Sequence, residues 1–196
     1  MHADLITVIL ARGMLQRHPG KGIIYDLRSS KVVPEEIVKL GGRPVRERVG
    51  HSFMKETMRK QDCIGGGELS GHFYFAENYY TDCGVLAAIL VLNQLSQEKR
   101  SLKAAADELR KYHGTGEINF KVADKDALMM QVERKYATGR IDHLDGVTVT
   151  FTDWWVNVRP SNTEPYLRMC LEADTRALME QKRQELFAIL GKPQDH

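Results

Sequence analysis

The sequence lacks the long apolar segments and cysteine pairs typical of membrane proteins and disulfide-rich secreted proteins. Its longest apolar run, CGVLAAILVLNQL, is shorter than the roughly 20 residues of a membrane span and is broken by two amides. Asp4 stands near the N-terminus, where a signal peptide would carry basic residues. Cys63, Cys83 and Cys170 are odd in number and widely spaced. We therefore expect reduced thiols and a cytoplasmic location.

The chain also lacks a strong charge of either sign. Its formal net charge is +2 over 196 residues, so the overall charge gives no reason to expect a nucleic acid or an anionic membrane as a partner. Hydrophobic residues make up 42% of the chain. This is enough to bury one sizeable core or two small ones.

Several catalytic signatures are missing. There is no GxxxxGK[ST] phosphate loop, no HExxH and no paired CxxC. The glycine run at 65–67 fails GxGxxG because Ser70 occupies the last glycine position, and it fails GxSxG because Glu68 occupies the first. No tight group of aspartates able to hold magnesium occurs in the chain. The sequence therefore gives no signal for a nucleotide loop, a serine nucleophile or a metal site.

The first part of the chain alternates helical and strand-like segments, which favours a parallel or mixed sheet covered by helices. We expect the apolar helix at 81–97 to be buried and to be capped by Thr81 or Asp82. The glycine run would end a strand. The predicted helices are 4–17, 33–42, 51–61, 81–97 and 101–113, and the predicted strands are 21–27, 43–49 and 62–69.

The pattern changes near residue 113, after which strand-like segments become more frequent. We expect strands within 114–122, 146–151, 154–158 and 166–173, and helices over 124–137 and 174–190. The predicted fold is an α/β mixed-sheet domain followed by a small α+β domain. Its boundaries are 1–112 for the first domain, 113–116 for a linker and 117–196 for the second domain.

The stretch GGGELSGHFYF at 65–75 is a first candidate binding segment. If its backbone is extended, Glu68, Ser70 and His72 project to one side. A carboxylate and a hydroxyl are suited to hydrogen-bonding sugar hydroxyls, and the flanking glycines would let a ligand approach the backbone. The alternative is a glycine-rich turn with Glu68 and His72 solvated.

The stretch RPSNTEPYLR at 159–168 is a second candidate. Arginine presents a planar fork that matches phosphate oxygens, and hydroxyls with turn backbone N–H groups can complete an anion site. The alternative is an ordinary polar turn between strands. The negative charge of Glu164 beside an anion site favours this alternative, unless Glu164 pairs with Arg168 or Arg159. The candidate phosphate-binding residues are Arg159, Ser161, Asn162, Thr163 and Arg168.

These two stretches resemble the sugar-recognition and phosphate-binding loops of the α-D-phosphohexomutases, in the phosphomannomutase/phosphoglucomutase branch. YDLRSSKVV with Arg28 and Lys31, and RVGHSFMK with Arg48, His51 and Ser52, resemble the third domain of that family. The resemblance covers essentially the whole chain and corresponds to domains three and four of a four-domain enzyme.

The resemblance implies transfer of phosphate between the 1- and 6-positions of a hexose, through a phosphoserine and magnesium in the first two domains. Hexose phosphate and hexose bisphosphate would be the ligands. It implies that Glu68, Ser70 and His72 bind the sugar, and that Arg28, His51 and His72 are candidate accessory catalytic residues. For His51, the alternative is a plain helix N-terminal residue.

The phosphoserine and metal loops of that family are absent from this sequence. We therefore expect a C-terminal fragment of a phosphomannomutase/phosphoglucomutase, which would be inactive alone and would partner the missing N-terminal domains. One alternative is a stand-alone, non-catalytic sugar-phosphate binding module. Another is a structural or interaction protein without a sugar ligand.

Overall fold

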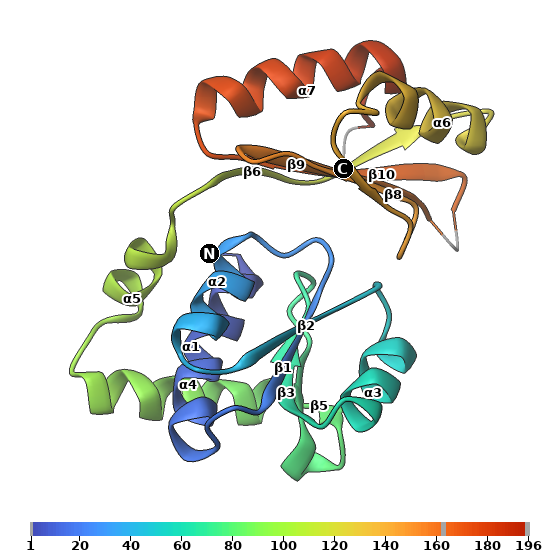
Figure 1. Cartoon of the computed structure of the whole chain (residues 1–196). Coiled ribbons are helices and arrows are strands. Elements are labelled where there is room, and N and C mark those ends of the chain that lie inside the picture. The colour runs from blue at the N-terminus through green and yellow to red at the C-terminus, as the bar shows by residue number, and fades with distance from the viewer. Residues whose placement is uncertain (1, 162–163, 195–196) are drawn as a thin grey trace. The chain divides into compact units, whose positions relative to one another are not determined.

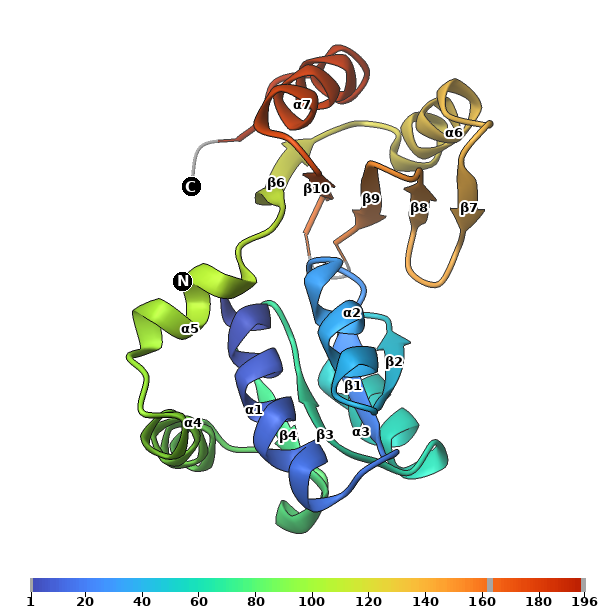
Figure 2. The ribbon, with the colours of Figure 1, turned by 60° about the vertical axis from the view of Figure 1, so that its left-hand side comes forward.

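The computed structural model describes residues 2–161 and 164–194. The chain forms two compact units, unit 1 (Met1–Lys111) and unit 2 (Tyr112–His196), which are described separately (Figures 1 and 2). Residues 113–116, the expected linker, belong to the first strand of unit 2. Within the described residues, no helix has both the length and the apolar character needed to cross a bilayer.

Unit 1 follows the predicted alternation of helices and strands. Its elements are α1 (Ala3–Arg17), β1 (Gly22–Asp26), α2 (Val32–Lys39), β2 (Arg43–Glu47), α3 (His51–Lys60), β3 (Cys63–Gly67), β4 (Phe73–Phe75), the 3-10 helix η1 (Ala76–Asn78), β5 (Thr81–Asp82), α4 (Gly84–Glu98) and α5 (Leu102–Leu109). The sheet order is β2-β1-β3-β4-β5. Strands β2 and β3 are parallel to β1, whereas β4 pairs antiparallel with β3 and β5 pairs antiparallel with β4. The predicted mixed sheet is confirmed.

The topology of unit 1 brings three strand ends to one edge of the sheet. Helices α1 and α2 cover one face and α3 covers the other (Figures 1 and 2). Because β2 and β3 lie on opposite sides of the parallel strand β1, the chain reverses its winding there. In open α/β sheets, ligands bind at the carboxyl ends of strands at such a reversal. Strand β1 ends at Asp26, β2 at Glu47 and β3 at Gly67.

The glycine run has a packing role within unit 1. A Cβ on Gly65 would lie 2.6 Å from the sulfur of Met14, and one on Gly66 would lie 1.9 Å from the carbonyl oxygen of Ile24. The three glycines therefore let β3 pack closely against its own neighbours. The expectation that they open the backbone to a ligand is not needed for residues 65–67.

Helix α4 differs from its prediction in two ways. Its N-cap is Cys83, whose sulfur accepts a hydrogen bond from the Leu86 N–H at 3.4 Å. The predicted caps, Thr81 and Asp82, lie in β5 instead. The helix is also not buried all round, because three apolar side chains on it are 58–72% exposed: Val85, Ile89 and Leu92.

Unit 2 is an antiparallel five-stranded sheet in the order β6-β10-β9-β8-β7, with both of its helices on the same face (Figures 1 and 2). Helix α7 packs on β10 and β6, and α6 packs on β8 and β9. The fold confirms the predicted α+β class. The elements are β6 (His113–Lys121), α6 (Lys125–Lys135), β7 (Arg140–Asp142), β8 (Val147–Thr150), β9 (Trp154–Pro160), β10 (Tyr166–Ala173) and α7 (Arg176–Leu190).

The core of unit 2 lies between the sheet and these helices. Leu186 and Leu190 of α7 are buried, and Leu178 and Ile189 pack against the same cluster, as the helical spacing predicts. The short strand β7 was not predicted, because three residues are too few to show an alternation.

Candidate functional site

The loop that follows the glycine run is a tight turn and not an extended strand end. Strand β3 stops at Gly67, and the Glu68 N–H donates to the His72 carbonyl at 2.9 Å. Inside this closure, the Gly71 N–H donates to the Glu68 carbonyl at 3.0 Å. Gly71 has φ of +90°, a conformation that favours glycine. The expected extended backbone is therefore wrong, and the turn leaves Glu68 buried, Ser70 exposed and His72 half-buried.

Asp26, at the end of β1, fixes two of the segments that carry candidate residues. Its carboxylate accepts from the Arg28 side-chain Nε at 3.0 Å and from the Leu69 backbone N–H at 3.0 Å. The Arg28 backbone N–H also donates to it at 3.0 Å. This carboxylate is fully buried, and these hydrogen bonds offset the cost of burying its polar atoms. Asp26 thus holds the guanidinium of Arg28 beside the turn.

Glu68 lies at the centre of the group of candidate side chains in unit 1. Its carboxylate is 1% exposed and accepts hydrogen bonds from the Tyr74 hydroxyl and from the Gly50 N–H, the latter at 3.3 Å. The Arg28 guanidinium lies 3.9 Å away. Burial, together with the hydrogen bond to Glu68, raises the pKa of Tyr74 well above its usual value. Because a carboxylate has about four lone-pair positions, Glu68 retains acceptor capacity for a ligand hydroxyl.

Two histidines complete this group. The rings of His51 and His72 are 4.3 Å apart between centroids and meet edge to face. Nδ1 of His72 lies 3.0 Å from the Ser70 hydroxyl, and Nδ1 of His51 lies 3.3 Å from a carboxylate oxygen of Asp82. The structure therefore brings together all five residues predicted for the first domain. These form the unit 1 cluster: Arg28, His51, Glu68, Ser70 and His72.

The second candidate segment forms the hairpin between β9 and β10. Arg159 and Arg168 are cross-strand partners, and both contact Glu117 on β6. Arg168 also pairs with Glu164 at 3.0 Å, so the expected pairing of Glu164 with an arginine is confirmed. Arg159 is buried, and its Nε has no hydrogen-bond partner among the residues that the structure describes. The Arg159 guanidinium is thus buried and has one N–H that donates no hydrogen bond to the described residues.

The hairpin is closed by backbone hydrogen bonds. The Ser161 N–H donates to the Tyr166 carbonyl at 2.9 Å, and the Lys125 ammonium donates to the Glu164 carbonyl at 2.9 Å. Lys125 also donates to the Ser161 carbonyl at 3.4 Å. A lysine therefore sits at this loop, although the sequence pattern did not suggest it. The two remaining predicted residues, Asn162 and Thr163, lie outside the described residues.

Sequence reasoning missed the residues that hold these side chains in place. Asp26 is the last residue of the buried strand β1, which was a usable signal, because the carboxyl ends of parallel strands meet at the sheet edge. Tyr74 belongs to the aromatic run FYF at 73–75, which by itself gave no signal of a contact with Glu68. Glu117 and Lys125 gave no signal, since they come close to Arg159 and Ser161 only through the fold of unit 2.

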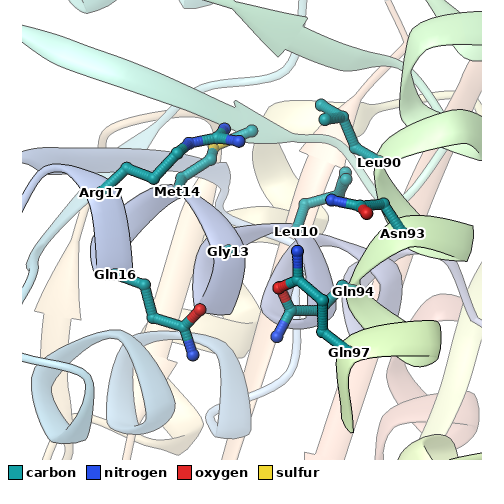
Figure 3. A pocket seen from close by; sticks show the side chains of 9 residues that line it. All are labelled: Leu10, Gly13, Met14, Gln16, Arg17, Leu90, Asn93, Gln94 and Gln97. Atoms are coloured by element: carbon teal, nitrogen blue, oxygen red, sulfur yellow. The ribbon is translucent and has the colours of Figure 1, made fainter. Parts of the chain in front are cut away.

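A pocket also lies between α1 and α4, and it shares no residue with the unit 1 cluster (Figure 3). Gly13 is in its wall, where a Cβ would approach the Gln94 side-chain oxygen to 2.6 Å. The side chains that line it are mostly amides and aliphatics: Leu10, Gly13, Met14, Gln16, Arg17, Leu90, Asn93, Gln94 and Gln97.

Comparison with known proteins gives consistent matches in sequence and structure. A phosphomannomutase of Methanocaldococcus jannaschii is 40% identical over 192 residues, which cover 98% of this chain and 43% of that protein. A phosphoglucomutase/phosphomannomutase family protein of Burkholderia thailandensis superposes with a TM-score of 0.84 at 26% identity, covering 99% of this chain and 43% of that one. The chain thus spans less than half the length of these relatives.

A more distant fold match is the Aspergillus fumigatus N-acetylphosphoglucosamine mutase in complex with GlcNAc-6P and magnesium. Its TM-score is 0.69 at 16% identity, and the match covers 97% of this chain and 47% of that one. Two family descriptions match this chain. Phosphoglucomutase/phosphomannomutase alpha/beta/alpha domain III matches residues 2–112, and the phosphoglucomutase/phosphomannomutase C-terminal domain matches residues 117–189. With both units matched in this order, the chain belongs to the phosphoglucomutase/phosphomannomutase family.

Proposed function

We propose that this chain is the sugar- and phosphate-recognition part of a phosphohexomutase, which moves phosphate between the 1- and 6-positions of a hexose. The observation that carries the proposal is the unit 1 cluster. A buried carboxylate, a buried guanidinium, two imidazoles and a hydroxyl converge at the carboxyl edge of a parallel sheet.

In this proposal, the unit 1 cluster binds the sugar. Glu68 accepts hydrogen bonds from sugar hydroxyls, and Ser70 and His72 supply further polar contacts. Glu68 is held in place by Tyr74 and Gly50, so it binds without having to be ordered first. Arg28 and His51 lie beside it and are the candidate accessory residues of the reaction.

The β9–β10 hairpin binds the phosphate that is not reacting. Arg159 and Arg168 supply guanidinium donors, while Ser161, Asn162 and Thr163 supply hydroxyl, amide and turn groups. Holding one phosphate while the other reacts is how positioning lowers the barrier of phosphoryl transfer.

The family resemblance implies magnesium, which the residues of this chain do not fit. Among the described residues, the one cluster of three or more side chains able to hold a metal is His51, Glu68 and His72. Magnesium prefers oxygen ligands in octahedral geometry, and two of these three ligands are imidazoles. The sequence contains neither a phosphoserine-type loop nor an aspartate-rich loop. We therefore propose that this chain alone does not catalyse the transfer.

A titration with mannose 1-phosphate or glucose 1-phosphate, followed by amide NMR shifts, tests this function. We expect shifts in 66–73 and 159–168. Inorganic phosphate alone should shift only 159–168, and mannose alone should leave 159–168 unchanged. An absence of response to either sugar phosphate at both segments would overturn the proposal.

A second measurement concerns catalysis and the upstream sequence. The chain alone should not convert mannose 1-phosphate to mannose 6-phosphate, whether or not magnesium is present. If the encoding reading frame continues upstream into serine and aspartate loops, the chain is part of a mutase. A frame that starts here would favour a stand-alone sugar-phosphate binding module.

A further inference from the structure

We propose that His51, Glu68 and His72 form a binding site for a borderline transition metal, for which Zn²⁺ is the probe. Each of the three offers one ligand atom, and these atoms lie within 4.8 Å of one another. Two imidazoles and one carboxylate are a ligand set that zinc uses in proteins, with the fourth position left for water.

The histidine rings are oriented by partners on their Nδ1 side. Nδ1 of His51 faces Asp82 at 3.3 Å, and Nδ1 of His72 faces the Ser70 hydroxyl at 3.0 Å. A carboxylate accepts the N–H of one ring nitrogen and leaves the other, here Nε2 of His51, as the metal ligand. The Ser70 hydroxyl can accept from Nδ1 of His72 in the same way. Metal sites commonly have this second layer of contacts.

Access and preorganisation also favour the site. Glu68 is buried and held by two hydrogen bonds, whereas the side chain of His51 is 45% exposed. A metal can therefore enter from the His51 side and meet a carboxylate that is already in place. Tetrahedral zinc, with bonds of about 2.0–2.1 Å, needs the ligand atoms closer than 4.8 Å, so we expect the half-exposed His51 side chain to move toward Glu68 and His72 on binding.

Two nearby cations, Arg28 and Lys55, oppose the metal. The Arg28 guanidinium lies 3.9 Å from Glu68 Oε2. It is also bound to the Asp26 carboxylate at 3.0 Å, and this pairing offsets its positive charge. Lys55 pairs at 3.3 Å with the same Asp82 oxygen that faces His51, and this carboxylate offsets the charge of Lys55. The site should therefore take a metal that binds imidazole well and should discriminate against magnesium.

The test is a Zn²⁺ titration of the untagged, metal-free chain against a chromophoric chelator. We expect one site in the unmodified chain, and an affinity at least about tenfold lower in His51→Ala and in His72→Ala. The matched control is His143→Ala, which removes a histidine that also lies near a carboxylate, Glu133 at 3.8 Å. Cys83→Ser controls for zinc bound by a half-buried thiol. Both controls should bind zinc like the unmodified chain.

Equal zinc affinity in the unmodified chain and in a folded His51→Ala/His72→Ala double variant would overturn the proposal. So would equal competition by magnesium at the same concentration. NMR of the histidine rings in the unmodified chain gives a result that needs no variant. Zinc should shift the ring signals of His51 and His72 but not those of His143, and the reverse pattern would reject the site. Because the probe is zinc alone, the result does not depend on whether the chain binds a sugar phosphate.

Discussion

Glu117 on β6 forms an ion pair with Arg159 on β9, with 2.6 Å between the carboxylate Oε2 and the guanidinium NH2. The Arg159 side chain is 5% exposed and that of Glu117 is 21% exposed, so solvent screens this ion pair only in part. A phosphate that approaches Arg159 must therefore share the guanidinium with this carboxylate. Substituting the arginine and removing the charge of the carboxylate should therefore change phosphate affinity in opposite directions.

The first prediction concerns these two residues. Arg159→Ala should weaken phosphate binding by about 1.5–3 kcal/mol, because a charged hydrogen-bond donor is lost. Glu117→Gln should strengthen it by up to about 1 kcal/mol, because a negative charge near the anion is removed while the shape is kept. Isothermal titration calorimetry with a hexose phosphate measures both effects. Arg134→Ala, on the exposed face of α6, is the control and should change nothing. Equal affinity in the Arg159→Ala variant would contradict the phosphate site.

The second prediction concerns the turn that carries Glu68. Tyr74 is fully buried and donates to the Glu68 carboxylate. Tyr74→Phe should lower the free energy of unfolding by roughly 1–3 kcal/mol, since a buried charged acceptor loses its donor. Urea unfolding followed by circular dichroism measures the change. Tyr79→Phe is the matched control, because the Tyr79 side chain is 85% exposed. If the two variants are equally stable, the hydrogen bond does not hold the turn.

The third prediction concerns the glycine run. A Cβ on Gly66 would lie 1.9 Å from the Ile24 carbonyl oxygen on the neighbouring strand β1. Gly66→Ala should therefore destabilise unit 1 by about 3 kcal/mol or more, because backbone cannot yield as a flexible side chain does. Gly84→Ala is the control: no atom lies within 4 Å of its added Cβ, and the change should stabilise α4 by up to about 1 kcal/mol. Thermal unfolding measures both variants, and a harmless Gly66→Ala would show that β3 is packed less tightly than described.

The fourth prediction concerns the buried thiol of Cys63. Burial raises its pKa to about 11, so the neutral thiol is favoured in the folded chain. The stability that this buried neutral thiol contributes is fully present below the thiol pKa of the unfolded chain. That contribution is lost as the pH rises above that value toward 11, because the unfolded chain gains the thiolate first.

Thiol labelling at pH 8 should therefore modify the half-buried Cys83 first, leaving the buried Cys63 and Cys170 protected until urea is added. The free energy of unfolding of the unmodified chain should fall between about pH 9 and 11, and Cys63→Ala should make this fall smaller. Rapid native labelling of Cys63 at pH 8 would refute the raised pKa.

The helices and strands of both units could largely be predicted from local patterns. Strand β10 begins and ends at its predicted residues, and α1 and α5 begin within one or two residues of their predicted starts. Periodicity and capping act between residues close in sequence, so they need no knowledge of the fold. The five predicted residues of the first domain also came together, because the ends of parallel strands share one edge.

Only the tertiary structure decided which side chains are buried and which side chains contact one another. Glu68 became a buried carboxylate, and not one of three groups on an extended strand, because the chain turns between β3 and β4. Glu117 met Arg159 because β6 lies two strands from β9 in the sheet. The sequence by itself determined the elements and the residue types of the two loops. Which charges face one another depended on segments far apart in the chain, because their contacts exist only after the sheets have formed.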